Sequence, residues 1–413
     1  MEQMIDCCGG LDVHRDTVVA TVRAPGSQQR ERRIATRTFT TTTGGLSELG
    51  DWLVAEHVEL VGMESTGVYW KPVFFALEER IDQVWLLNAE HLRNVPGRKT
   101  DVADSVWIAE LVEHGLVRPS FVPPADIRAL RDLTRYRRTL VEERTRAIQR
   151  LEKVMQDAGI KLTSVASTLL GKSGRAIIDA LLAGVSDPVM LAELAKGRLR
   201  SKIPALREAL TGAFRVEHHG LLVRQMLAHI DFLDESVAAI DAKIESAITV
   251  HEPVIERLVT IPGVARKTAI GLIAEVGVDM SVFPTPADLA SWAGICPGNN
   301  ASGGKRRSGR TRHGSVWLRT VLTEAAQAAA RTKGTYLAAH HATVRGRRGR
   351  FRAIGATRHD LLIAYWHVVH DEVDYRELGA DWAVRRFSPE HQLKRLIRQI
   401  ERLGKTVTVT DAA

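Results

Sequence analysis

Cysteine is scarce in this chain, with three residues in 413. Cys7 and Cys8 are adjacent and Cys296 lies far from them, which gives neither a disulfide framework nor the ligand spacing of a zinc site. The distribution favours a reducing compartment, the cytoplasm.

Long apolar runs are also lacking. The first residues, MEQMIDCCGGLDVHRD, carry acids where a signal peptide needs a basic start and an apolar stretch. We therefore expect a soluble protein with no membrane partner. A nucleotide-binding P-loop is missing too, because GNNASGGKRR has an extra Gly before Lys305, no Ser or Thr after it and no preceding strand. Nucleotide hydrolysis is disfavoured.

The composition is that of a globular protein, with 45% hydrophobic and 26% charged residues. The length is too great for one core and predicts two folded units, at 1–120 and 251–413, joined by a connector at 121–250. The net charge of +8 favours a polyanionic partner, because clustered Lys and Arg displace counterions from phosphate backbones.

Strand and helix patterns alternate in the first 120 residues. Runs rich in β-branched residues predict an antiparallel meander of Ile5–Val13, Thr17–Arg23 and Ile34–Thr40. With Thr43 as N-cap, a helix is predicted at 44–57, followed by strand 58–65, helix 66–80, strand 82–89 and a further helix. A meander followed by alternating helices and strands indicates an RNase H-like α/β sheet.

The middle of the chain predicts a helical connector. Heptad-like apolar positions in 125–158 indicate a long amphipathic helix or coiled coil, and 221–248 predicts a second long helix. The intervening segment, 161–215, is helical in propensity and carries no chemical motif, which leaves only spacing or oligomerisation as its role. A composition change at Pro253 opens a mostly α-helical C-terminal domain.

Four acidic residues of the first domain are candidates for a metal site. Asp12 lies near the end of the first predicted strand and Glu64 at the end of VELVGMES, and these strands are neighbours in an RNase H-like sheet. Asp101 and Asp104 are three residues apart at a helix start and share one face. Four converging carboxylates would bind one or two Mg²⁺ ions, which activate the attacking oxygen and stabilise the leaving oxygen in phosphoryl transfer.

The same acids also have a structural interpretation. The pair at the helix start would complement its N-terminus, and the other two would be isolated strand-end acids. The position of Glu64 favours the metal site, because exposure to solvent does not explain an acidic residue within an apolar strand. Arg98 and Lys99 lie where they would steer phosphate toward the site, whereas His14 and Asp16 are expected to be turn residues only.

A serine in a basic, glycine-containing segment is the candidate nucleophile. Ser302 precedes two glycines, which would let a phosphate approach closely and expose backbone N–H groups to it. Attack by its hydroxyl on phosphorus would form a phosphoserine and conserve the bond energy for rejoining. The alternative is a flexible basic loop that contains a serine by chance. The expected nucleic-acid-binding cations of this segment are Lys305, Arg306, Arg307, Arg310 and Arg312.

Two further segments predict phosphate contacts. TIPGVARKTAIGLIAEVG has the form of a helix-hairpin-helix, in which the turn at Gly263 and the side chain of Lys267 would meet a DNA backbone; an ordinary helix pair is the alternative. VRGRRGRFRA offers Phe351 for stacking on a base. A solvated charge run remains the alternative there, although little acid lies nearby. The binding arginines expected in this segment are Arg347, Arg348 and Arg350.

Taken in order, five blocks of the chain resemble the DEDD transposases of insertion sequence family 110, the bridge-RNA-guided serine recombinases. The blocks are LDVHRDT, MESTGVYW, NAEHLRNVPGRKTDVADSVWIAEL, IPGVARKTAIGLIAEVG and AGICPGNNASGGKRRSGRTRHGSVWLRTVLTEAAQAAAR. The resemblance spans nearly the whole chain, and departures are small. Arg15 stands where Lys is usual, Ser105 stands where Ala is usual, and 161–215 makes this a longer member.

This resemblance implies a RuvC-like domain and a transposition reaction. Asp12, Glu64, Asp101 and Asp104 match the family's metal-binding tetrad, and Ser302 matches its catalytic serine. The implied chemistry is Mg²⁺-dependent attack of the serine on a DNA phosphate in a homo-oligomer, a dimer or tetramer, whose domains from different protomers act together. A structured guide RNA pairs with donor and target DNA, and the protein would be nucleoid-associated in a prokaryotic cytoplasm.

Two other functions remain open from the residues alone. A metal-dependent nuclease or junction resolvase would use the same four carboxylates with water as nucleophile. A non-catalytic nucleic-acid-binding protein would carry them as structural acids. The role of Ser302 separates the first from a recombinase, and the effect of removing Asp12 or Glu64 separates the second.

Overall fold

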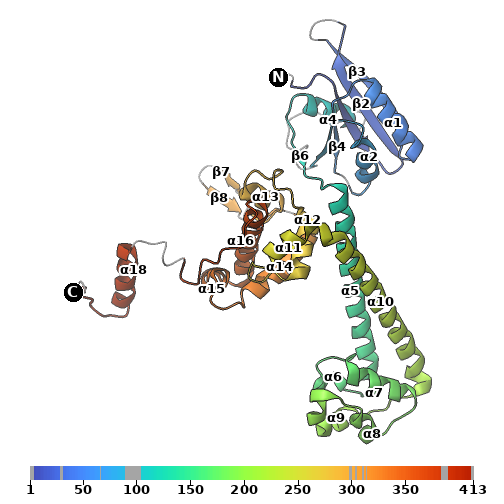
Figure 1. Ribbon diagram of the computed structural model, residues 1–413, viewed down its shortest axis with the longest axis vertical. Helices are drawn as coiled ribbons and strands as arrows, with labels where there is room; N and C mark the ends of the chain where they lie inside the picture. Colours follow the sequence, from blue (N-terminus) through green and yellow to red (C-terminus); the bar gives the residue numbers. More distant parts are fainter. Residues whose placement is uncertain are drawn as a thin grey trace. The chain divides into compact units, whose positions relative to one another are not determined.

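A computed structural model describes residues 4–27, 31–65, 67–88, 104–296, 300–302, 305–308, 311–312, 314–382 and 389–410 (Figure 1). The chain divides into two compact units, Met1–Val122 and Pro123–Ala413. Three predicted site residues, Arg98, Lys99 and Asp101, lie outside the described residues, as does Arg310.

The first unit is built on a mixed sheet with the strand order β3-β2-β1-β4-β5-β6 in its described part. Strands β1 to β3 form an antiparallel meander, β1, β4 and β5 run parallel, and β6 is antiparallel to β5. This arrangement confirms the predicted RNase H-like sheet. The strands are β1 (Cys8–Val13), β2 (Thr17–Pro25), β3 (Arg32–Thr40), β4 (Leu60–Glu64), β5 (Gln83–Leu87) and β6 (Pro119–Ser120).

Helices pack on both faces of this sheet (Figure 1). Leucines of α1 (Thr43–Ala55) and α2 (Trp70–Leu77) share a buried cluster with Leu11 and Met63 on one face. On the other face, α4 (Asp104–Glu113) shares a cluster with Cys8 and Leu60. Each face is closed by apolar side chains, so the sheet is a rigid support for residues at its ends.

Several predicted boundaries were wrong by a few residues. The N-cap of α1 is Thr42, not Thr43, since the Thr42 side chain accepts a hydrogen bond from the Gly45 N–H. The helix predicted at 66–80 is confined to α2, and the first strand begins at Cys8, not Ile5. The two-residue strand β6 was not predicted, because its pairing with β5 is set by tertiary contacts.

Two long helices dominate the beginning of the second unit and confirm the predicted helical connector. Helices α5 (Ala125–Asp157) and α10 (Leu221–Ile248) pack side by side and antiparallel. Arg137 of α5 pairs with Asp241 of α10, and Arg144 of α5 pairs with Asp234 of α10. The two ion pairs are seven residues apart on each helix, and the numbering rises on α5 as it falls on α10. This heptad spacing is that of a coiled-coil seam.

A small helical module closes the far end of this helix pair (Figure 1). Its side chains join those of α5 and α10 in one buried apolar cluster that includes Leu151, Leu162, Ile177, Leu206 and Leu227. The elements are α6 (Leu162–Val165), α7 (Lys172–Leu182), α8 (Pro188–Glu193), the 3-10 helix η2 (Gly197–Lys202), α9 (Ile203–Ala209) and a π-helical turn (Val216–Gly220).

The rest of the second unit is mostly helical, with α16 at its centre. Tyr365 of α16 donates to the Gly277 carbonyl at 2.5 Å, and Trp366 Nε1 donates to the Phe283 carbonyl at 2.8 Å. None of the described helices combines the length and apolar character that a bilayer-spanning segment needs. The elements are α11 (Glu252–Leu258), α12 (Arg266–Val276), α13 (Pro286–Trp292), β7 (Asn300–Ser302), β8 (Lys305–Ser308), α14 (Val316–Ala329), α15 (Tyr336–Arg348), α16 (Arg350–His370) and α18 (Pro389–Glu401).

Candidate functional site

Asp12 and Glu64 lie at the carboxyl ends of two adjacent parallel strands. The β1–β4 register pairs Gly10 with Gly62 and Leu11 with Met63. One further step along both strands places Asp12 beside Glu64. Because neighbouring strands are about 4.8 Å apart, the two residues start from adjacent backbone positions.

Both carboxylates are on the face of the sheet that α4 covers. A Cβ on Gly10 would lie 2.2 Å from the Ser105 carbonyl oxygen of α4, and one on Gly62 would lie 2.6 Å from the Val112 side chain of the same helix. Side chains alternate along a strand, so residues two positions further on point the same way. Asp12 and Glu64 therefore share this face, and glycine is needed at positions 10 and 62 so that α4 can pack closely.

The first turn of α4 lies toward the same end of the sheet. Contacts move back along α4 as β1 advances: Met4 N donates to the Glu113 carbonyl at 3.0 Å, Cys8 Sγ donates to the Ala109 carbonyl at 3.4 Å, and Gly10 meets Ser105. The helix is thus antiparallel to β1. Its first residue, Asp104, is half-buried and lies toward the end that carries Asp12 and Glu64.

Ser105 fixes the position of this first turn. Its hydroxyl is 2.8 Å from the Thr21 hydroxyl on β2, which is itself 2.8 Å from the Thr36 hydroxyl on β3. Ser105 and Thr21 are fully buried, so the shared hydrogen bond joins α4 to the meander in a medium without competing water. This hydrogen bond therefore holds Ser105, the residue next to Asp104, in place.

His14 contacts the candidate metal ligand Asp12. The sequence did not predict this contact. Its Nε2 lies 3.2 Å from Asp12 Oδ2, and the Asp12 side chain is 20% exposed. His14 follows β1 directly, and the only signal for the contact was its position two residues after an acid at a strand end. A turn role alone therefore does not describe this histidine.

The donor set suits a hard divalent cation. Carboxylate oxygens are the ligands that Mg²⁺ prefers, and the backbone brings Asp12, Glu64 and Asp104 toward one end of the sheet. Within the described residues, no three His, Cys, Asp or Glu side chains lie close enough to hold a metal ion. Asp101, the fourth predicted ligand, lies outside those residues. The backbone thus brings three candidate carboxylates toward one end of the sheet, while the described side chains do not form a complete set of metal ligands.

An acid at the opposite end of α4 serves as a structural contrast. The Glu113 side chain is 2% exposed and is bound by Arg23 at 2.6 Å and Arg32 at 2.5 Å. Two guanidinium groups compensate its charge, as a buried carboxylate requires. The Asp12 side chain is more accessible, at 20% exposed. Glu113 is therefore a structural acid, which its burial between two arginines shows.

Burial also makes the two N-terminal cysteines poor nucleophiles. Desolvation raises the pKa of Cys8 to about 12 and raises the pKa of Cys7 above its usual value. Both thiols are free, and both donate to backbone carbonyls. They are packing residues of the sheet and take no part in the candidate chemistry.

In the second unit, Ser302 is the last residue of a β-hairpin strand. The antiparallel pair β7–β8 aligns Ser302 with Lys305 and Ala301 with Arg306. Ser302 thus lies in a strand pair, and its role as nucleophile stays a prediction. Lys305, Arg306 and Arg307 all belong to β8, so three of the predicted cations share one strand with the serine as its neighbour.

Two glycines hold the ends of the serine-bearing segment together. A Cβ on Gly314 would lie 2.1 Å from the Ala293 carbonyl oxygen, and one on Gly294 would lie 2.9 Å from the Gly314 nitrogen. Gly294 also has a positive φ of 66°. This close backbone crossing needs residues without side chains, and it fixes the base of the segment that carries Ser302.

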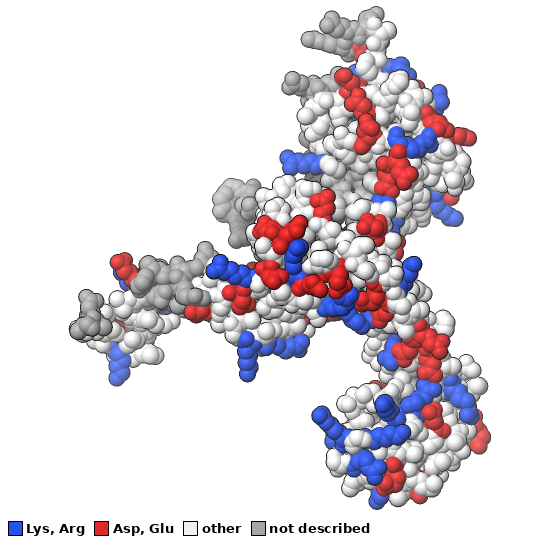
Figure 2. All heavy atoms as spheres, in the orientation of Figure 1, with Lys and Arg blue, Asp and Glu red and all other residues white. Residues whose placement is uncertain are grey.

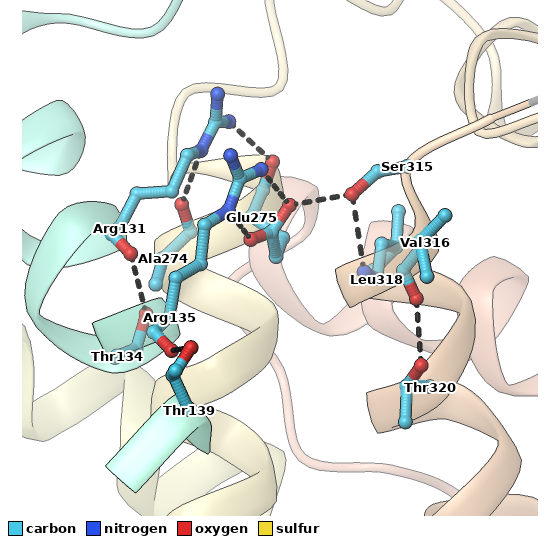
Figure 3. A network of polar contacts seen from close by, with 10 residues as sticks. All are labelled: Arg131, Thr134, Arg135, Thr139, Ala274, Glu275, Ser315, Val316, Leu318 and Thr320. Carbon is cyan, nitrogen blue, oxygen red and sulfur yellow. Dashed lines mark hydrogen bonds and ion pairs between the residues drawn. The ribbon is translucent and has the colours of Figure 1, made fainter. Parts of the chain in front are cut away.

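A buried polar network anchors that base to α5 and α12 (Figure 3). Glu275 of α12 is 3% exposed, and Arg135 of α5 donates to both of its carboxylate oxygens, at 2.7 and 2.8 Å. Ser315, next to Gly314, donates to Glu275 Oε2 at 2.9 Å and accepts from the Leu318 N–H as the N-cap of α14. The carboxylate therefore ties α14 to the connector helix.

Arg131 completes the network by binding main-chain oxygens (Figure 3). It donates to the Ala274 carbonyl at 3.0 Å and to the Glu275 carbonyl at 2.6 Å, at the last turn of α12. Burial lowers the pKa of Arg131 from its usual value. Sequence reasoning missed these residues. The available signal was an acid inside the apolar run GLIAEVG, the same signal that singled out Glu64.

The predicted helix-hairpin-helix segment forms two helices, α11 and α12, joined by a turn. Gly263 in the turn has a φ of 87°, and a Cβ there would lie 2.5 Å from the Ala329 nitrogen of α14. Its small size is thus required by packing against α14. Lys267 is 75% exposed and lies 4.0 Å from Asp241. Phosphate contact by either residue stays a prediction.

The arginine-rich segment forms a corner between α15 and α16. Gly349 separates the helices with a φ of 83°, and Phe351 is 87% exposed. None of the corner arginines makes an ion pair with any described residue. Arg312 is likewise exposed. The corner arginines are Arg345, Arg347, Arg348, Arg350 and Arg352.

Two transposase families match separate stretches of the chain. Residues 9–160 match the DEDD transposases of IS110, described as transposase, and residues 255–342 match the transposase IS116/IS110/IS902 family. The first stretch contains Asp12, Glu64, Asp101 and Asp104, and the second contains Ser302. Residues 161–254 lie between the two.

Similar bacterial proteins cover different shares of the chain. A family 20 transposase of Pseudomonas aeruginosa is 27% identical over 276 residues, 66% of this chain and 71% of that protein. A transposase of Sinorhizobium fredii is 28% identical over 227 residues, 54% of this chain and 49% of that one. A protein of insertion element IS110 from Streptomyces coelicolor is 35% identical over 83 residues, 20% of each chain.

Two solved structures of RuvC from Thermus thermophilus are also similar to part of the chain. The protein alone has a TM-score of 0.22 and 13% identity, and covers 27% of this chain and 99% of RuvC. RuvC in complex with a Holliday junction substrate has the same TM-score and identity, with coverage of 28% and 99%.

Proposed function

Because separate stretches of the chain match two transposase families of IS110 elements, we propose that it cuts and rejoins DNA strands by a Mg²⁺-dependent serine attack. The observation that carries this proposal is the placement of three acids at one end of the sheet. The register aligns Asp12 with Glu64, the glycines before them face α4, and α4 begins at Asp104 toward the same end. Asp101 is proposed as the fourth ligand.

The proposed nucleophile is the Ser302 hydroxyl. Its oxygen attacks a DNA phosphorus and loses its proton, the bond from phosphorus to one sugar oxygen breaks, and that oxygen takes up a proton. The strand is then held as a phosphoserine ester, from which a second strand's sugar hydroxyl releases the serine and restores a phosphodiester. When bound, Mg²⁺ would stabilise charge on the phosphoryl group as a Lewis acid. The β8 cations adjoining Ser302 favour a phosphate at this position.

The proposed partners follow from the family resemblance. They are donor and target DNA, a structured guide RNA and further copies of the chain in a dimer or tetramer. The phosphate-binding residues proposed are the cations of β8, Arg98, Lys99, Lys267, Arg310, Arg312 and the corner arginines, with the backbone of Gly263.

A covalent-adduct assay tests the serine attack. The full chain is incubated with Mg²⁺, RNA from the element's flank and labelled donor DNA, and denatured products are separated by size. We expect a protein–DNA adduct in the wild type and in Ser308→Ala, a matched control at the end of β8, and none in Ser302→Ala. Cleaved ends without an adduct in any variant would refute the serine attack and indicate the metal-dependent nuclease with water as nucleophile.

A further inference from the structure

The helical module at the end of α5 and α10 carries basic residues that no part of the proposed reaction uses. We define this distal module as residues 158–220, of which all but the first three lie between the two stretches that match transposase families. We propose that the distal module binds the phosphate backbone of a nucleic acid. The proposal rests on the proposed function only in taking nucleic acid as the partner.

The distal module has a folded core, so its surface is fixed. Leu162, Ile177, Leu181, Leu191 and Leu206 are all at most 2% exposed and belong to one apolar cluster. The Lys161 N–H also donates to the Ala209 carbonyl at 2.7 Å, which joins the start of the module to the end of α9. A fixed surface holds charged side chains in one arrangement instead of averaging them over a flexible segment.

The charge of the distal module is unbalanced. It contains nine Lys and Arg and five Asp and Glu, a net charge of +4 within a chain of net +8. Three of its acids have local partners: Asp179 lies 3.4 Å from Arg175, Glu193 lies 3.1 Å from Arg207, and the Asp187 side chain caps α8. These acids are therefore engaged within the module's own structure.

Five of the module's exposed cations that make no ion pair with a described residue lie around η2 and the start of α7. Four of them flank or belong to η2, and its end is tied down by a hydrogen bond of 3.2 Å from Lys202 Nζ to the Val165 carbonyl. The fifth, Lys172, precedes Ser173, whose hydroxyl accepts from the Lys196 N–H at 2.8 Å. The start of α7 and the start of η2 thus adjoin. The five cations are Lys172, Lys196, Arg198, Arg200 and Lys202.

The dimensions suit a phosphate backbone. A 3-10 helix rises about 2 Å per residue, so the backbone from Lys196 to Lys202 spans about 12 Å. This corresponds to the axial length of three to four phosphates of one strand, which are about 3.4 Å apart. Lys and Arg gather on the visible face of the distal module (Figure 2). Unpaired cations on such a surface gain free energy by releasing counterions and read no sequence.

Matched double variants of the full chain test the proposal. Arg198→Gln with Arg200→Gln removes two unpaired cations, whereas Arg175→Gln with Arg207→Gln removes two cations that are paired with acids. Binding of a labelled RNA hairpin and of a labelled DNA duplex is measured at several salt concentrations without Mg²⁺, so that no cleavage occurs. Thermal unfolding establishes that each variant is folded.

We expect the first pair alone to weaken binding, by about tenfold or more near 0.1 M salt, with the salt slope smaller by up to about 1.8. Arg198→Lys with Arg200→Lys should retain the wild-type slope, because the charges remain. Loss for RNA only, for DNA only, or for both identifies the bound partner. Equal affinities and slopes in the two glutamine pairs overturn the proposal. If the wild type binds neither nucleic acid, the proposed function fails with it.

Discussion

The buried carboxylate of Glu275 gives the sharpest test of how the serine-bearing segment is held. Glu275→Gln keeps the shape of the side chain but removes its charge. Arg135 then retains one acceptor of two, and Ser315 loses a charged acceptor. A hydrogen bond to a charged group contributes about 1.5 to 3 kcal/mol, and breaking a fully buried ion pair costs about 3 to 5 kcal/mol.

Solvent access to Arg135 reduces this cost, because its side chain is 27% exposed. We therefore expect about 2 to 3 kcal/mol less stability for the contacts that join α12, α14 and α5. Since each 1.4 kcal/mol is a factor of ten, amide hydrogen exchange in the first turn of α14 and the last turn of α12 should accelerate about 30- to 150-fold. Local exchange is the suitable assay, because a chain of two units need not unfold in one step.

The matched control is Glu324→Gln, which also removes an ion pair to α5. Glu324 is 63% exposed and lies 3.0 Å from Arg138. Exposed pairs contribute about 0 to 1 kcal/mol, so exchange in α14 should change by less than about fivefold. Equal acceleration in both variants, or none for Glu275→Gln, would refute the account of a buried anchor beneath the segment that carries Ser302.

Three further predictions concern the first unit and the α15–α16 pair. Asp12→Asn or Glu64→Gln should reduce Mg²⁺-dependent strand cleavage by about 100-fold or more without lowering the thermal stability. Glu113→Gln should instead lower the thermal stability, because it leaves Arg23 and Arg32 uncompensated. Cleavage assays and thermal unfolding distinguish the two effects. Gly10→Ala should displace α4 and weaken cation binding measured by calorimetry, because its Cβ meets backbone atoms, whereas Gly44→Ala, with nothing within 4 Å, should not; equal effects would contradict the placement of α4. The hydrogen bond to Asp360 raises the pKa of His340, so its stabilisation should be full below about pH 6.5 and be lost as the pH rises through the folded-state pKa; in His340→Gln this decline, followed by thermal unfolding against pH, should disappear.

Local patterns predicted the sheet and the long helices because these elements follow repeating spacing. The β-branched runs of the meander and the apolar spacing of the long helices each indicate a structure from one segment alone. For this reason α10 begins and ends where predicted. Positions set by a second segment were less predictable. Strand β6 exists only through two residues that pair with β5, and the shift of the α1 N-cap depends on which threonine reaches Gly45.

The candidate site was predictable to the extent that acids stand at the ends of predicted strands. Sequence alone placed Asp12 and Glu64 on neighbouring strands, and the register and the two glycines add that both face α4. The contact of His14 with Asp12 was not predictable, since it depends on the turn geometry after β1. The hairpin at Ser302 was missed because a basic, glycine-rich composition is typical of a loop. In the structure, Ser302 on β7 instead pairs with Lys305 on β8.

One sequence signal led to two different kinds of residue. Glu64 and Glu275 are both acids inside apolar segments, yet Glu64 is half-buried at a strand end and Glu275 is 3% exposed with a bidentate arginine. An acid in an apolar run indicates only that some partner compensates its charge. Where the partner is an arginine of the same chain, as for Glu113 and Glu275, the acid is structural. Glu64 differs from these two, because the fold places it beside Asp12 at the end of the sheet toward which α4 begins, and this placement is what supports the proposal of a metal there.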